Sequence, residues 1–208
     1  AARLMSEHGI APDQIGHIGH GTTVATNLII ERKGALCGLI TTKGFRDVLE
    51  IGRQVRPHLY DYSVIKPPAL VPRALRCEAA ERISAKGAIQ LGLNEDDVRA
   101  AAEYLRDAGV EAIAICFLHS YRNPLHEQRA RDIVKEAAPD VYISISSDVL
   151  PEFREYERLS TTALNATVGP RMERYLQRFL DRVSAAGVPA EPLTIHSNGG
   201  LMSVETVR

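Results

Sequence analysis

The sequence predicts an α/β protein whose mostly parallel sheet carries helices on both faces. Short apolar strands alternate with amphipathic helical segments at both ends of the chain, and strands separated by helices of this length favour parallel pairing with both faces covered. Hydrophobic residues make up 45% of the 208 residues, which is enough to bury a sizeable core. A proline-rich middle segment interrupts the alternation, so we expect an inserted extended and hairpin segment within the α/β frame.

Residues 1–52 are the first predicted α/β block, with the order βαβα. The second strand, "ALCGLITT", is too short and too β-branched for a helix. Gly34 follows the first helix, where a helix end favours a left-handed residue. The predicted elements are a strand at Ile15–Gly19, a helix at Val24–Lys33, a strand at Leu36–Thr41 and a short helix at Phe45–Ile51.

Residues 53–92 form the predicted insertion. They combine prolines with Leu, Ile, Val and Tyr at strand spacing, which is typical of extended segments and turns. We expect a hairpin that turns at Ala85–Ala88.

Residues 93–190 return to the α/β pattern as a second block. Asn94 and Asn123 are predicted helix caps, Pro124 suits a first helical position, and Gly109 suits a helix end. We expect a strand at Glu111–His119 and another from Val141, and we expect the longest helix to follow Pro170 and to close at Gly187. The apolar helix stripes are Val98, Ala101, Ala102 and Leu105; Ala130, Ile133, Val134 and Ala137; and Met172, Tyr175, Leu176, Phe179 and Val183. Residues 191–208 add a strand, a polar turn and a helix start, which we interpret as the beginning of a following domain.

Charge and composition exclude several classes of function. The chain has 25 basic and 26 acidic residues without long runs of either sign, so we expect no nucleic-acid partner. No segment approaches the ~18–20 apolar residues of a membrane span or resembles a signal peptide, so we expect a cytoplasmic protein. Three widely spaced cysteines, Cys37, Cys77 and Cys116, are typical of reduced core thiols.

Three polar segments follow predicted strands: "GHGTT" (19–23), "LHSYRNP" (118–124) and "HSNGG" (196–200). Ligands of open α/β sheets bind at the carboxyl ends of the strands. The sequence therefore predicts a polar crevice where these segments meet.

The first of these segments has two interpretations that the residues alone leave open. Its glycines allow a sharp turn, and Thr22 or Thr23 can cap the helix that follows. The same turn with His20 can instead bind or activate a ligand, although it matches no standard phosphate-loop motif. His17 and His20 need not converge, and no metal site is expected there.

Two further segments carry weaker candidates. "EYERLSTT" (155–162) holds Glu157 and Ser160, but its hydroxyls can equally bond back to a helix backbone. "RPHLYDY" (56–62) holds Arg56 and His58 with the composition of a binding loop and no spacing that dictates a mechanism.

Four segments together resemble the N-terminal region of the hydantoinase A and 5-oxoprolinase family, which includes ATP-dependent acetone and acetophenone carboxylase subunits. They are "HGTTVATNLIIERKGALCGLITTKGFRDVLEIGRQVRP", "GVEAIAICFLHSYRNPLHEQRA", "VLPEFREYERLSTTALNATVGP" and "IHSNGGLMS", in collinear order along essentially the whole chain. The resemblance implies an actin-like ATPase fold of the ribonuclease H-like type. It also implies that 191–208 begin the hydantoinase A ATPase domain.

The resemblance implies an ATP-dependent amidohydrolase of the N-methylhydantoinase or 5-oxoprolinase type. Such an enzyme phosphorylates a lactam carbonyl before the ring opens, with Mg²⁺ or another divalent cation on the phosphates. The expected partners are a small-molecule cyclic amide and a second, B-type subunit within an oligomer. Two alternatives stay open, an ATP-dependent ketone carboxylase subunit and a non-catalytic subunit-interaction module.

The resemblance also implies site residues. His20, Thr22 and Thr23 match the catalytic segment. The residues implied to bind nucleotide or substrate are Gly21, Asn27, Arg56, His58, Glu157, Ser160, Ser197, Asn198, Gly199 and Gly200. Family members carry glycine-rich phosphate segments before and after the region matched here, so we expect ATP and Mg²⁺ to need segments missing from this chain. The 208 residues alone are accordingly expected to be an inactive fragment.

Overall fold

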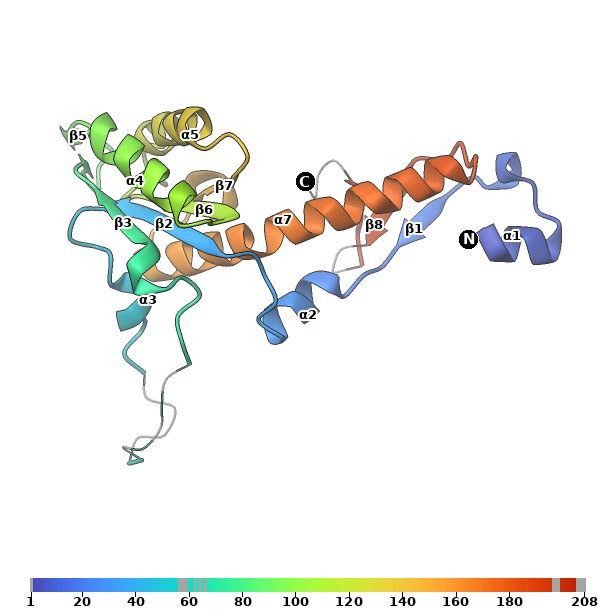
Figure 1. Cartoon of the computed structure of the whole chain (residues 1–208), viewed down its shortest axis with the longest axis horizontal. Helices are drawn as coiled ribbons and strands as arrows, with labels where there is room; N and C mark the ends of the chain where they lie inside the picture. The colour runs from blue at the N-terminus through green and yellow to red at the C-terminus, as the bar shows by residue number, and fades with distance from the viewer. Residues whose placement is uncertain are drawn as a thin grey trace. The chain divides into compact units, whose positions relative to one another are not determined.

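The computed structural model describes residues 2–55, 60, 61, 63, 65, 67–195 and 199–204. The chain divides into two compact units (Figure 1). One unit comprises Gly34–Pro170, and the other comprises Ala1–Lys33 with Arg171–Arg208. The two units are described separately.

The Gly34–Pro170 unit is built on a parallel sheet with the strand order β3-β2-β6-β7. Every residue of the central strands β2 and β6 is buried, as expected for strands covered on both faces. The bounds are β2 Cys37–Thr42, β3 Arg76–Ala79, β6 Ala112–Cys116 and β7 Tyr142–Ile145.

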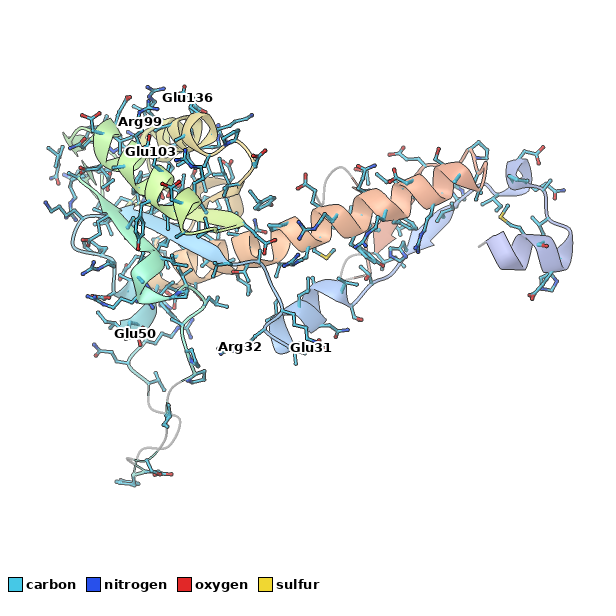
Figure 2. All side chains as sticks on the ribbon, viewed as in Figure 1. Glu31, Arg32, Glu50, Arg99, Glu103 and Glu136 are labelled. Carbon is cyan, nitrogen blue, oxygen red and sulfur yellow. The ribbon has the colours of Figure 1, made fainter. Side chains whose placement is uncertain are left out.

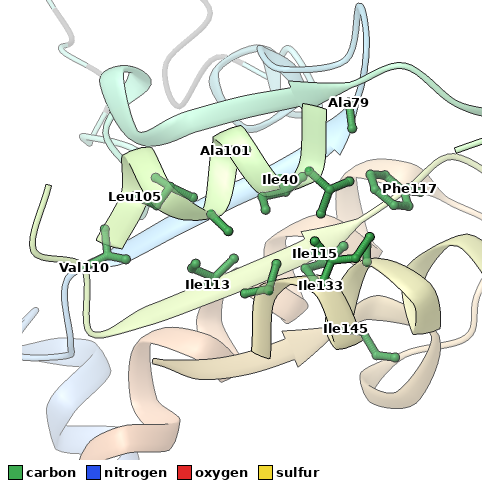
Figure 3. Close-up of a cluster of buried hydrophobic side chains, with 14 residues drawn as sticks. Ile40, Ala79, Ala101, Leu105, Val110, Ile113, Ile115, Phe117, Ile133 and Ile145 are labelled. Carbon is green, nitrogen blue, oxygen red and sulfur yellow. The ribbon is translucent and has the colours of Figure 1, made fainter. Parts of the chain in front are cut away.

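The two faces of this sheet carry separate apolar clusters because strand side chains alternate. On one face, Ile113 and Ile115 pack with residues of α4 (Glu95–Asp107) and α5 (Leu125–Ala137), as Figure 3 shows. On the other face, Ala112 and Ala114 pack with residues of α3 (Val48–Ile51) and α7 (Glu155–Ala185). The predicted parallel sheet with helices on both faces is confirmed.

The signals for α4 are confirmed in detail. Asn94 caps the helix, because its side chain accepts hydrogen bonds from the N–H groups of Asp96 and Asp97 at 3.1 and 3.2 Å. Gly109 adopts a φ of 75° just after the helix. The predicted stripe is buried: Val98, Ala101, Ala102 and Leu105.

The next helix, α5, begins one residue later than the prediction. Pro124 occupies the cap position, and the side chain of Asn123 accepts the N–H of Leu125 at 3.1 Å. The buried stripe of Ala130, Ile133 and Val134 is confirmed.

The prediction that the longest helix follows Pro170 is wrong. The helix α7 begins at Glu155, spans 31 residues and contains Pro170 in its interior. A proline removes one backbone hydrogen bond, but the turns before it bury Leu159, Ala163 and Ala166 against the sheet. This buried stripe offsets the lost bond.

Segment 53–92 contains the predicted hairpin, formed by β4 (Arg82–Ile83) and β5 (Ile89–Leu91). Ser84 and Gly87 close its turn through backbone bonds. The segment also supplies η2 (Arg73–Leu75) and the edge strand β3, so part of the predicted insertion belongs to the main sheet. Sequence pattern missed β3 because a short edge strand that is only partly buried has little periodicity.

The predicted role of Gly34 as a left-handed helix end is wrong. Helix α2 (Val24–Ile30) ends before Lys33, and Arg32 has the positive φ, 52°. Gly34 is instead a close-packing position, since a Cβ there would lie 2.8 Å from the backbone oxygen of Thr167 on α7.

The second unit contains a small three-stranded sheet. β1 (Ile18–His20) pairs in parallel with β8 (Pro192–Ile195), and β8 pairs antiparallel with β9 (Leu201–Ser203). β9 lies between the polar turn and the expected helix start in 203–208, where Val204, the last described residue, is helical. The other elements of the unit are α1 (Ala2–His8), η1 (Pro12–Gln14), α2 and the part of α7 from Arg171.

Charged side chains cover the helices of the larger unit, as for Arg99 of α4 and Glu136 of α5, whose charged groups lie 3.5 Å apart (Figure 2). Cys37 and Cys116 are buried free thiols, and Cys77 is partly buried. In the described part of the chain, no helix is long and apolar enough to cross a membrane.

Candidate functional site

The turn after β1 combines a cap with a polar surface. Thr22 Oγ accepts the N–H of Val24 at 3.2 Å, so the capping interpretation holds for Thr22. Thr23 occupies the N-cap position of α2 without a side-chain cap bond. Gly21, Thr23 and Asn27 are exposed.

His20 is held by two aromatic residues of α7. Its Nε2 lies 2.7 Å from the hydroxyl oxygen of Tyr175, within hydrogen-bond distance. Its ring stacks on Phe179 with the centroids 4.3 Å apart. The imidazole therefore has a set orientation at the carboxyl end of β1, while the proton position depends on its tautomer.

Two of the three polar segments follow neighbouring strands. His20 of β1 lies opposite Thr194 of β8, so "GHGTT" and "HSNGG" leave the same end of a parallel strand pair. In the second turn Gly199 has a φ of 86°. Ser197 and Asn198 lie outside the described residues, and Gly200 is exposed.

The third polar segment does not share this sheet. "LHSYRNP" follows β6, which belongs to the sheet of the other unit. The premise of one sheet edge carrying all three segments is therefore wrong. Strand alternation alone cannot reveal that β1 and β6 belong to different sheets.

Glu157 and Ser160 line a separate hollow of ≈ 560 Å³ in the larger unit, together with Gly52–Val55, Tyr156 and Thr161. Arg53 Nε donates to Glu157 at 2.7 Å. The pKa of Glu157 is lowered, mainly because its carboxylate accepts a hydrogen bond from the Glu157 backbone N–H. The hydrogen bond from Arg53 lowers it further. Glu157 is therefore a carboxylate paired with a cation. Arg56 and His58 follow Arg53 in sequence but lie outside the described residues.

Sequence reasoning missed the residue between these two candidates, Arg158, which is 1% exposed. Its Nε donates to Ser146 Oγ at 3.1 Å, and one terminal nitrogen donates to the carbonyl of Phe117 at 2.8 Å. Ser146 Oγ donates to the buried carboxylate of Glu127 at 2.6 Å. Burial raises the pKa of Glu127, although bonds from Ser146 and backbone N–H groups oppose the shift.

A second buried polar group lies beside the ends of β2 and β3. Glu81 accepts a hydrogen bond from Thr42, and its other oxygen lies 2.8 Å from Nδ1 of His126. In the sequence, the buried polar residues Glu81, His126, Glu127 and Arg158 differ from surface residues only in lying close to apolar residues. Buried polar side chains that are fully bonded specify one packing arrangement, so we interpret both groups as supports for the strand ends.

The hollow at Glu157 and the β1 turn each offer hydrogen-bonding or ionic groups to a small polar ligand. Among the described residues, no group of three or more His, Cys, Asp or Glu side chains is arranged to hold a metal ion. Mg²⁺ therefore has no identified protein ligands in this part of the chain.

Comparison with known sequences decides the family. Residues 1–138 match the profile of the hydantoinase/oxoprolinase N-terminal region, and residues 158–208 match that of the hydantoinase/oxoprolinase domain. The chain belongs to the hydantoinase/oxoprolinase family. The resemblance deduced from the sequence motifs is confirmed.

Three relatives show the range of this hydantoinase/oxoprolinase family. An uncharacterised protein of Methanocaldococcus jannaschii is 41% identical over 93% of this chain and 29% of its own length. The caprolactamase subunit alpha of Pseudomonas jessenii is 43% identical over 88% of this chain and 26% of its own. The acetophenone carboxylase gamma subunit of Aromatoleum aromaticum is 34% identical, over 90% of this chain and 27% of its own. The chain thus spans less than a third of each relative.

Two solved structures share the fold. The ATP-dependent caprolactamase from Pseudomonas jessenii matches with a TM-score of 0.87 and 38% identity, over 96% of this chain and 30% of its own. Nucleotide-free acetone carboxylase matches with a TM-score of 0.85 and 31% identity, over the same shares. These matches confirm the α/β architecture and are consistent with the actin-like ATPase fold of the family.

Proposed function

We propose that this chain is part of an ATP-dependent enzyme that hydrolyses a cyclic amide. The observation that carries the proposal is the similarity to caprolactamase along nearly the whole chain, at 43% identity to its alpha subunit. Identity to the acetophenone and acetone carboxylase subunits is lower, at 34% and 33%. A cyclic amide is therefore the favoured substrate class, and 5-oxoproline and hydantoins are members of it.

The chemistry explains the need for ATP. A lactam carbonyl is a weak electrophile, and phosphoryl transfer to its oxygen creates a leaving group. Water can then add to the carbonyl carbon, and the ring C–N bond breaks with the nitrogen leaving as the amine. A second water hydrolyses the resulting acyl phosphate to the carboxylate and free phosphate. Bound Mg²⁺ would neutralise phosphate charge during the transfer.

We propose that His20 is a catalytic residue of this reaction, together with Thr22 and Thr23 in the turn that follows β1. Support comes from the set orientation of the His20 ring and from its position at a strand's carboxyl end. A histidine ring held in a fixed orientation can serve as a general acid or base. Gly21, Asn27 and the "HSNGG" turn would bind nucleotide or substrate beside His20. Glu157 and Ser160 would bind a ligand in the hollow that they line.

A second candidate function is subunit interaction. In segment 53–92, the described residues Val55, Tyr60 and Ile65 have exposed fractions of 75, 87 and 90%. Large exposed apolar side chains in one segment are typical of contact surfaces. The relatives include alpha, beta and gamma subunits of larger enzymes. We propose that segment 53–92 contacts a second subunit, and such a contact is compatible with catalysis.

The test uses the natural polypeptide that contains these residues, together with its second subunit. ADP and ring-opened product are measured with ε-caprolactam, 5-oxoproline or hydantoin, and with acetone plus bicarbonate. We expect a cyclic amide to stimulate ADP release in proportion to ring opening. Stimulation by the ketone and bicarbonate alone, with carbon fixation, would assign the carboxylase function instead.

A further inference from the structure

A hollow of ≈ 640 Å³ lies between α2 and the part of α7 that begins at Arg171. The functions proposed above do not use this hollow. Figure 1 labels both helices; α2 and the later turns of α7 belong to the unit formed by Ala1–Lys33 and Arg171–Arg208. Its volume falls within the usual range for small-molecule sites. The hollow is lined by Val24, Leu28, Arg171, Arg174, Tyr175, Gln177 and Arg178.

The walls of this hollow differ in character. Val24 and Leu28 lie one turn apart on α2 and present apolar side chains. On α7, Arg171, Arg174 and Arg178 recur at helical spacing and share one face. The described lining contains three guanidinium groups and no carboxylate.

Arginines three and four positions apart on a helix gather positive charge on one face of it. Arg178 Nε donates to the carbonyl of Arg174 at 3.2 Å, which orients its guanidinium group. Each guanidinium group carries five N–H donors in a planar fork. A guanidinium group that already makes one contact can therefore still donate to an anion. Such forks match carboxylate and phosphate oxygens.

We propose that this hollow binds an oxyanion, a carboxylate or a phosphate group, through Arg174 and Arg178 with help from Arg171. The apolar wall of Val24 and Leu28 suits the carbon ring or base of the same ligand. Tyr175 lines the hollow and also contacts His20, so the bound ligand would lie beside the β1 turn. Only its link to turnover rests on the proposed function.

The test measures binding without turnover, by calorimetry on the natural polypeptide. Tripolyphosphate is the phosphate probe, 5-oxoproline is the carboxylate probe, and 2-pyrrolidone is the matched neutral ring. We expect one or both anions to bind, the neutral ring to bind more weakly, and affinity to fall as salt rises. The anion that binds identifies the source of the oxyanion, and binding of neither overturns the proposal.

Variants locate the binding site. Arg174→Gln and Arg178→Gln should each raise the Kd about tenfold, since each removes a charge-assisted hydrogen bond. Arg182→Gln is the matched control, because Arg182 lies on the same helix and outside the lining. Unchanged binding in the first two variants, or an equal loss in the control, would overturn the assignment.

A chemical measurement on the wild type covers the case of misfolded variants. Phenylglyoxal modifies accessible arginines, and the bound anion should protect Arg174 and Arg178 but leave Arg182 reactive. Equal modification of all three with and without the anion would contradict the proposal. If cyclic-amide turnover fails while protection is seen, the proposed function falls and the anion site stands; the reverse result has the opposite meaning.

Discussion

At the scale of single residues, His20 has two possible contributions that the structure helps to separate. Its contacts with Tyr175 and Phe179 attach β1 to α7 within one unit. The same contacts set the ring orientation that proton transfer requires. A purely structural histidine and a catalytic one respond differently when only the Tyr175 hydroxyl is removed.

We predict that His20→Ala lowers kcat of the natural enzyme by roughly 100-fold, the usual size of a general acid–base contribution. Tyr175→Phe should lower kcat less than His20→Ala does, because the ring stays packed and only the hydroxyl is lost. Steady-state kinetics and thermal melting check both variants. A fall in Tm with an unchanged kcat would identify His20 as a packing residue only.

The three cysteines should differ in reactivity. Burial raises the pKa of the Cys37 and Cys116 thiols to about 12, and burial also raises the pKa of the partly buried Cys77. Thiolate is the reactive form, so Cys77 should be alkylated first and should react faster as pH rises towards 9. Mass spectrometry after iodoacetamide treatment checks the order, and denaturant should make all three react alike. Early labelling of Cys116 in the native protein would contradict the buried position of β6.

At the scale of elements, the packing of α7 against the start of β2 depends on a glycine. Ala35 N–H donates to the carbonyl of Thr167 at 2.8 Å, which brings the two backbones together at Gly34. A Cβ at Gly34 would lie 2.2 Å from Cγ2 of Thr167 and 2.8 Å from its backbone oxygen. The backbone atom cannot rotate away.

Gly34→Ala should therefore destabilise the protein by about 1–3 kcal/mol, the usual range for overpacking. Gly92→Ala is the control, because a Cβ there meets no atom within 4 Å. Urea unfolding measures both. Equal stability of the two variants would mean that α7 moves aside at low cost.

The cap of α4 is a second test at this scale. Asn94→Ala removes the acceptor for two backbone N–H groups and should cost about 1 kcal/mol. Asn94→Asp keeps the acceptor and should retain most of the stability. Thermal unfolding distinguishes the variants, and equal losses for both would exclude the cap as the cause.

At the scale of the whole molecule, the two units differ in how much they bury. Every residue of β2 and β6 is buried, whereas none of the three residues of β1 is. Protection of amides from exchange follows local burial and hydrogen bonding. We predict the slowest hydrogen–deuterium exchange in β6 and faster exchange in β1, measured by mass spectrometry of peptides. Equal protection of both strands would show that the units open together.

Local patterns were sufficient for most helices and buried strands. The stripe and cap of α4 follow from residues a few positions apart, and the apolar run 112–116 is long enough to identify a strand. The start of α7 was not accessible in this way, because Pro170 is a helix breaker by local rules and burial of the preceding turns overrides them.

For the candidate site too, the sequence identifies some residues and only the tertiary structure identifies the others. The turn residues His20, Gly21 and Thr22 can be chosen from the sequence, since a polar turn after a strand is a local signal. The contact of His20 with Tyr175 joins residues 155 positions apart, and the burial of Arg158 depends on strand ends and helices from across the unit. Amphipathic periodicity and caps reflect short-range chemistry and can be read along the chain. The assignment of β1 and β6 to different sheets, and the side chains gathered at the strand ends, depend on contacts between distant segments. No local pattern specifies such contacts.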